Sequence, residues 1–150
     1  MPDSQAVLEM MTTAEAVYLA TVRDGAPRIR AMVNLRHPES FPGISQFCRA
    51  QGFVCYFATS LASGKVDELR ADSSASVYFA DPRSTHGIEL RGKVEVLTDP
   101  GLRRTLWQEV WRVYWPSGET DPDYAVLRFA PWSACGWWGT EPFRLELSSQ

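Results

Sequence analysis

The chain has 150 residues, of which 45% are hydrophobic and 22% charged, a size and composition typical of one globular domain, residues 1–150. Its formal net charge of −3 excludes a general basic surface for nucleic acid or an anionic membrane, so an anion site must be local. No run of 18 apolar residues and no signal-like start occurs, and the three cysteines lack CxxC spacing. The sequence therefore predicts a soluble, cytoplasmic protein with buried thiols.

The first elements in chain order are a helix and a strand. Residues 4–16 carry apolar side chains at helical spacing, so we expect an N-terminal helix within residues 1–16. Residues 17–22 are strand-like, and the following Asp24-Gly25 pair favours a tight hairpin turn.

The second strand of this hairpin alternates apolar and polar residues over 27–35. Ile29, Ala31 and Val33 form its apolar face, and arginines, Met32 and an asparagine form the other. Such alternation predicts a half-buried strand with one polar face. Residues 36–52 hold prolines and glycines and predict a loop with at most a short helical turn.

The stretch from residue 53 to 79 carries the first candidate chemistry. An apolar run over 53–58 predicts a buried strand, residues 66–71 predict a short helix, and 74–79 predict another strand. Between strand and helix lie three hydroxylic residues and a lysine, namely Thr59, Ser60, Ser63 and Lys65.

This turn can bind an anion. Free backbone N–H groups at the helix start, the helix dipole and the Lys65 ammonium would all attract negative charge. Ser63 can cap the helix or donate to a phosphate oxygen. The same residues would also suit a simple capped helix with a solvated lysine, and this stretch alone leaves both interpretations open.

The second half of the chain predicts more strands and one helix. A long strand over 85–98 is interrupted by Gly92, which indicates a bulge or a close backbone approach. Two further strands are expected, at 124–130 (before Pro131) and 143–147, with the segment 134–138 between them. Six or seven strands, mostly joined by hairpins, with about three helices favour a mainly β (α+β) fold, a small antiparallel barrel.

The predicted helix spans 100–115, with Asp99-Pro100 as its start signal. It would carry two apolar faces, one with Leu102, Leu106, Val110 and Val113 and one with Trp107, Trp111 and Tyr114. A wide core-facing surface would explain both faces. Contact of the aromatic face with a second subunit or a planar ligand would explain them equally well.

Common catalytic motifs are absent from the sequence. It contains no GxSxG, HExxH, P-loop or GxGxxG, and two isolated histidines without a cysteine cluster do not predict a metal site. If the protein is an enzyme, we expect a cofactor to supply the chemistry.

Three segments together resemble the flavin-binding split-barrel family, which includes pyridoxamine 5′-phosphate oxidase and smaller general-stress-type proteins. They are LATVRDGAPRIRAMVNL (19–35), FATSLASGKVDELRADSSASVYF (57–79) and VLRFAPWSACGWWG (126–139). The segment before DPDYAVLRF, ending in WPSG, is similar to the general-stress branch. The resemblance implies an FMN-binding split β-barrel, a homodimer with flavins at its interface, and a flavin-dependent oxidoreductase acting on a small molecule.

The resemblance also implies roles for individual residues. Arg30 and Lys65 would bind the FMN phosphate, and Thr59, Ser60 and Ser63 would donate to it. Met32 and Val33 would lie along the isoalloxazine ring, and Trp137 would come from the opposite subunit. Trp107 and Trp111 are further interface or cofactor candidates from the aromatic face alone.

Some positions depart from the oxidase itself. Ser63-Gly64-Lys65 stands where the oxidase has Ser-Arg-Lys, and Arg144-Leu145-Glu146-Leu147 lacks the histidine and last arginine of its C-terminal signature. We therefore do not expect pyridoxamine 5′-phosphate oxidation as such. A non-catalytic flavin- or haem-binding or sensing dimer, or a deazaflavin-dependent reductase, remains an alternative.

Overall fold

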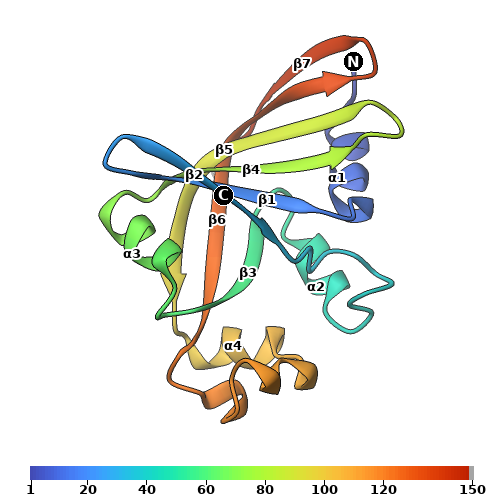
Figure 1. Cartoon of the computed structure of the whole chain (residues 1–150). Coiled ribbons are helices and arrows are strands. Elements are labelled where there is room, and N and C mark those ends of the chain that lie inside the picture. The colour runs from blue at the N-terminus through green and yellow to red at the C-terminus, as the bar shows by residue number, and fades with distance from the viewer. Residues whose placement is uncertain (149–150) are drawn as a thin grey trace.

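The computed structural model describes residues 1–148 and shows one strongly curled antiparallel sheet (Figure 1). In the described part of the chain the sheet has seven strands in the order β2-β1-β4-β5-β6-β3, with β7 paired to β6. The strands are β1 (Val17–Arg23), β2 (Ala26–Met32), β3 (Cys55–Ser60), β4 (Ser74–Asp81), β5 (His86–Leu97), β6 (Tyr124–Trp138) and β7 (Glu141–Glu146).

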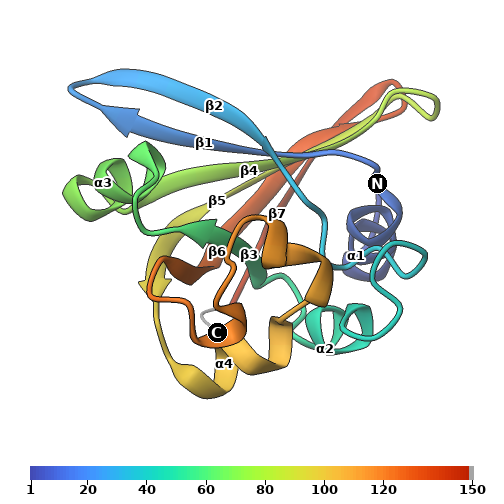
Figure 2. The same ribbon diagram turned by 60° about the horizontal axis from the view of Figure 1, so that its bottom comes forward.

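Short helices surround this sheet (Figures 1 and 2). They are α1 (Ser4–Thr13), α2 (Ser45–Ala50), α3 (Gly64–Ala71), α4 (Pro100–Leu106) and the 3₁₀ segments η1 (Glu109–Val113) and η2 (Gly118–Thr120). In both views α3 lies on one side of the molecule, α1 and α2 lie on the other, and α4 lies near one end. Side chains cap three of them, through Asp3, Ser63 and Asp99.

The sheet curls into a barrel that stays open along one seam. Strand β2, which pairs only with β1 within residues 1–148, forms one edge, and β3 and β7, which both pair only with β6, share the other. A barrel with an open seam between two edge strands is a split barrel, so the predicted fold class is confirmed.

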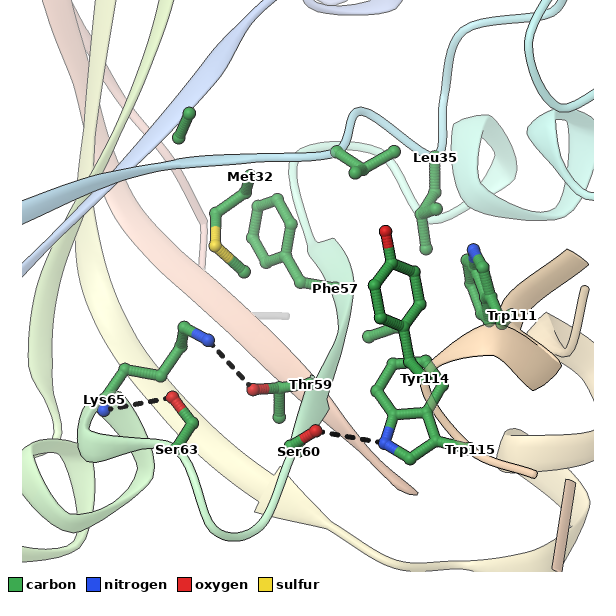
Figure 3. A pocket seen from close by; sticks show the side chains of 13 residues that line it. Met32, Leu35, Phe57, Thr59, Ser60, Ser63, Lys65, Trp111, Tyr114 and Trp115 are labelled. Carbon is green, nitrogen blue, oxygen red and sulfur yellow. Dashed lines mark hydrogen bonds between the residues drawn. The ribbon is translucent and has the colours of Figure 1, made fainter. Parts of the chain in front are cut away.

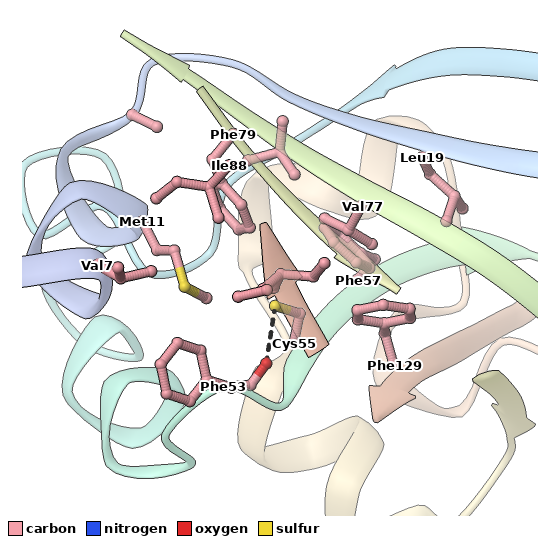
Figure 4. Packing of buried hydrophobic residues seen from close by; sticks show 14 of the residues in the cluster. Val7, Met11, Leu19, Phe53, Cys55, Phe57, Val77, Phe79, Ile88 and Phe129 are labelled. Carbon is pink, nitrogen blue, oxygen red and sulfur yellow. Dashed lines mark hydrogen bonds between the residues drawn. The ribbon is translucent and has the colours of Figure 1, made fainter. Parts of the chain in front are cut away.

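The hollow of the sheet is filled by apolar side chains (Figure 4). Strands β1 and β3 bury every second residue, as expected for strands with one face on a core. Helix α1 closes one end of the core with Val7, Met10 and Met11. Cys48 and Cys55 are also buried, and burial raises the pKa of the Cys55 thiol to about 12.

Strand β2 presents the opposite face from the one that its sequence predicts. Ile29 and Val33 are 71% and 58% exposed, whereas Arg30 and Met32 on the other face are partly buried. The expectation of a buried Ile29-Ala31-Val33 face was therefore wrong for the single chain. The reason is that β2 is an edge strand whose Arg30 pairs with an acidic residue on α3, so the polar face turns inward.

The predicted helix 100–115 was also wrong, because it breaks after Leu106. Trp107 and Gln108 take extended backbone angles, and the Gln108 side chain donates to the carbonyls of Leu106 and Trp107. The chain resumes as the 3₁₀ segment η1 with a changed phase. Trp111 is buried, but Val110 and Val113, expected on one apolar stripe with Leu102 and Leu106, are about three-quarters exposed.

The long strand β6 runs through Pro131, where the sequence predicts an interruption. Its register with β5 shifts between Arg91 and Gly92, and Gly92 pairs with Pro131. A Cβ at Gly92 would collide with the Ala130 carbonyl oxygen, which confirms the predicted bulge and close approach. Proline is tolerated in a strand at such a bulge because no ladder hydrogen bond is required of it.

Candidate functional site

A cavity of about 470 Å³ lies at the seam between the edge strands β2 and β3 (Figure 3). Its walls come from the end of β2, from β3, from the start of α3 and from η1 and the residues that follow it. The lining residues are Ala31, Met32, Val33, Leu35, Phe57, Ala58, Thr59, Ser60, Ser63, Lys65, Trp111, Tyr114 and Trp115. Segments far apart in sequence thus form one site because the sheet curls its two edges together.

One end of the cavity is polar and is built by the corner from β3 to α3. Ser63 is the N-cap of α3, and its hydroxyl accepts a hydrogen bond of 3.3 Å from the Lys65 backbone N–H. The Lys65 ammonium donates to Oγ1 of Thr59 at 3.2 Å (Figure 3). The corner therefore gathers hydroxyl groups around one cation, which is a set of donors suited to an anion.

Lys65 carries its charge without an acidic partner within 4.0 Å in residues 1–148. Partial burial lowers the pKa of Lys65, and the nearby Arg30 guanidinium lowers it further, while Glu68 acts in the opposite direction. A bound anion would remove part of this penalty, so the charge arrangement favours anion binding at this corner.

Arg30 lies near the same corner but does not line the cavity. Its Nη2 donates to Oε2 of Glu68 at 2.8 Å, and its Nη1 donates to Oγ1 of Thr21 at 2.7 Å. Thr21 in turn donates to the Glu68 carboxylate, which closes a small network behind α3. The two predicted phosphate-binding cations are thus brought together at one helix, with Arg30 held by an acidic residue.

The other end of the cavity is aromatic. Trp111, Tyr114 and Trp115 border it from η1 and the residues after it, and Phe57 faces it from β3 (Figure 3). The indole Nε1 of Trp115 donates to Oγ of Ser60 at 3.1 Å, which fixes this wall to β3. Tyr114 is 69% exposed, so the aromatic end opens to solvent.

Most of the residues predicted for the site line this one cavity. They are Met32, Val33, Thr59, Ser60, Ser63, Lys65 and Trp111. Trp107 packs on Trp111, Trp115 and Tyr124 within its own chain and does not line the cavity. Trp137 lies near the end of β6, also outside the cavity lining, and is 54% exposed.

Sequence reasoning missed several lining residues, chiefly Leu35, Phe57, Ala58 and Trp115. Phe57 and Ala58 lie inside the predicted buried strand, and nothing in their residue type distinguishes a cavity wall from core. Trp115 follows the predicted aromatic face by one helical turn from Trp111, so continuing that face would have included it.

The cavity combines binding groups of two kinds and lacks an obvious catalytic set. A lysine and hydroxyl groups lie at one end, and flat apolar side chains lie at the other. Neither His37 nor His86 lines it. The arrangement suits a ligand with an anionic end and a planar end, such as a phosphorylated cofactor with an aromatic ring. No helix in residues 1–148 is long and apolar enough to cross a bilayer.

The fold and the cavity at its seam define the class of split-barrel proteins. A model of the family described as pyridoxamine 5′-phosphate oxidase like matches residues 5–146. The chain therefore belongs to the pyridoxamine 5′-phosphate oxidase-like family. A search of curated protein sequences found no significant match.

Solved structures from several bacteria share this fold. A Clostridium acetobutylicum protein related to general stress protein 26 superposes with a TM-score of 0.76 at 23% identity, covering 97% of each chain. General stress protein 26 from Bacillus anthracis gives 0.68 at 20% identity, covering 94% of this chain and 98% of that one. The general stress FMN/FAD binding protein from Xanthomonas citri gives 0.65 at 17% identity, covering 98% and 96%.

Proposed function

We propose that this protein binds FMN in the seam cavity and, as a homodimer, acts as a flavin-dependent oxidoreductase on a small molecule. The observation that carries the proposal is the pairing of the Lys65 ammonium, which has no acidic partner within the described residues, with an aromatic wall at the opposite end of the same cavity. Family membership and the described FMN/FAD binding of the Xanthomonas citri protein support the choice of flavin.

The residues present fit the two ends of FMN. Lys65, Ser63 and Thr59 would hold the phosphate, which carries close to two negative charges at neutral pH. Met32 and Val33 would lie along the isoalloxazine ring, and Trp111 would border it from η1. Bound flavin supplies the hydride or electron transfer, and the chain's own residues orient the ring and limit the access of water.

The dimer is supported by apolar side chains that the single chain leaves exposed. Five large apolar residues are each more than half exposed: Ile29 on β2, Val33 just after it, Val113 on η1, Tyr114 just after it, and Trp137 on β6. Two of them, Val33 and Tyr114, line the cavity, and large exposed apolar side chains are typical of a subunit interface. In the proposed dimer Trp137 of the second copy would approach the flavin, a role that the single chain leaves as a prediction.

The direct test is flavin uptake by the purified protein. We expect the protein to be yellow or to take up added FMN in a defined ratio, with its visible bands shifted from those of free flavin. Extraction and mass measurement of the cofactor distinguish FMN from a deazaflavin or haem. A colourless protein that does not bind added FMN would contradict the proposal, and a monomer at micromolar concentration in gel filtration would contradict the dimer.

A non-catalytic flavin-binding or sensing dimer is the second candidate. The contact of Arg30 with Glu68 favours it, because Glu68 already neutralises one of the two cations proposed to bind the phosphate. The phosphate site is weaker as a result. The two candidates differ in turnover. An oxidoreductase passes electrons from reduced bound flavin to an acceptor faster than free flavin does, whereas a sensor does not.

A further inference from the structure

Two cations, Arg30 and Lys65, lie near the polar end of the cavity. The buried carboxylate of Glu68 forms an ion pair with one of them, Arg30. The carboxylate contacts Arg30 at 2.8 Å, with side-chain exposures of 7% for Glu68 and 23% for Arg30. Thr21, which is 1% exposed, donates to the same carboxylate and to nothing in the cavity lining. Hydrogen bonds to a charged group are stronger than those between neutral groups, so these contacts stabilise the Glu68 carboxylate beside Arg30.

The charges at this corner sum to one positive unit. Arg30 and Lys65 each contribute +1 and Glu68 contributes −1, while the charges of the exposed Arg28, which also acts on Glu68, and of the exposed Asp67 cancel. Only Lys65 presents its charge to the cavity. A phosphate monoester brings almost two negative charges at neutral pH, whereas a phosphodiester brings one. The corner as it stands therefore matches a singly charged phosphate.

We propose that Glu68 competes with the ligand phosphate for Arg30 and so sets how much charge the site accepts. This inference rests on the proposed flavin site. While Glu68 holds Arg30, the charge of Lys65 balances a singly charged phosphate, and the hydroxyl groups donate hydrogen bonds to it. A doubly charged phosphate gains Arg30 only by breaking the contact with Glu68. The residue is thus a specificity determinant for the charge of the phosphate group and makes no contact with the flavin ring.

The experiment compares FMN with riboflavin, which is the same ligand without phosphate. The dissociation constant of riboflavin divided by that of FMN isolates the contribution of the phosphate, and flavin fluorescence gives both constants. In Glu68→Gln we expect this ratio to rise at least about tenfold because FMN binds more tightly. Tenfold is the lower end of what a charge-assisted hydrogen bond contributes. Riboflavin affinity should stay unchanged.

The double variant Arg30→Met/Glu68→Gln shows whether the gain runs through Arg30. We expect it to remove the gain. A gain that persists would mean that Glu68 acts only by its own charge, and would overturn the proposal. An unchanged ratio in Glu68→Gln would also overturn it, because Glu68 would then have no effect on phosphate binding. Weaker FMN binding would overturn it too, because Glu68 would then hold Arg30 in its binding position.

Two controls keep the result interpretable. Thermal unfolding shows whether Glu68→Gln is folded; if it is not, Glu68→Asp retracts the carboxylate from Arg30 while keeping the charge, and a smaller rise in the ratio is expected. An unchanged ratio in the folded Glu68→Asp would then overturn the proposal. If the unaltered protein binds neither flavin, the proposed function itself fails; if it binds riboflavin but the ratio does not respond, only the role of Glu68 fails.

Discussion

Ser60 and Trp115 connect the two walls of the cavity through one hydrogen bond, from the indole Nε1 to the serine Oγ at 3.1 Å. Ser60 is the last residue of β3, and Trp115 follows the 3₁₀ segment 55 residues further along the chain. Because the serine oxygen accepts here, its own hydroxyl hydrogen remains able to donate toward the cavity. The same side chain can thus fix the wall and still offer a donor to the cavity.

The first prediction concerns this bond. Ser60→Ala should reduce the free energy of unfolding by about 0.5–1.5 kcal/mol, the usual net contribution of a hydrogen bond. Trp115→Phe should cost more, because packing is lost as well. A double-mutant cycle in urea unfolding isolates the shared term, and additive effects would show that the bond does not form in solution.

The second prediction concerns Lys65. Lys65→Met keeps the aliphatic stem and removes the charge, so FMN affinity should fall about tenfold to a hundredfold while riboflavin affinity stays the same. Stability should change little, because the ammonium is partly buried and has no acidic partner within 4.0 Å among residues 1–148. The matched control is Lys93→Met, the only other lysine, which is exposed on β5. Equal FMN affinity in both variants would remove Lys65 from the site.

The third prediction concerns Gly92. Gly92→Ala places a methyl group against the carbonyl of Ala130 at the bulge, so we expect a loss of about 1–3 kcal/mol, as for other overpacked positions. Gly43→Ala is the control, because its added Cβ has no atom within 4 Å. Urea unfolding of the two variants measures the difference, and similar midpoints would contradict the close approach.

The fourth prediction concerns pH and Glu68. The hydrogen bond from Thr21, followed by the contact with Arg30, holds the pKa of Glu68 below its ordinary 4.5. A carboxyl group with a lowered pKa stabilises the fold above its unfolded pKa, and this contribution disappears as the pH falls through the folded value. The unaltered protein should therefore be more stable than Glu68→Gln at pH 7, by about 1–3 kcal/mol.

This difference should shrink as the pH is lowered from 5 toward 3. Thermal unfolding of both proteins across this range measures it. A constant gap would mean that Glu68 contributes through packing and not through its charge. A gap that grows in acid would contradict the lowered pKa.

Local chemistry made part of this structure predictable from sequence. The alternation along β1, the Ser63 cap and the interruption at Gly92 each depend on neighbours along the chain or on one residue type. For the same reason the hydroxyl groups and Lys65 could be assigned to one corner: they lie within a single strand-turn-helix segment. Of the seven predicted residues that line the cavity, four lie on or next to the edge strands β2 and β3, two lie at the start of α3 and one lies on η1.

Long-range contacts set the limits of sequence reasoning. The inward turn of Arg30 depends on Glu68, 38 residues later, and periodicity along β2 contains no record of that partner. The break after Leu106 depends on Gln108 folding back onto the helix end, whereas the apolar spacing alone suits a continuous helix. Both errors therefore arise where a polar side chain forms a hydrogen bond with a partner that the spacing of apolar residues in the sequence does not predict.

The open seam has a consequence for how a ligand enters. Within the described residues β2 and β3 exchange no backbone hydrogen bonds, so moving them apart breaks no rung of the sheet. The Ser60–Trp115 bond joins β3 to the aromatic wall but not to β2, which is held instead by its pairing with β1 and by the Arg30–Glu68 contact. A ligand that approached the cavity along this seam would therefore not have to break any backbone hydrogen bond between β2 and β3.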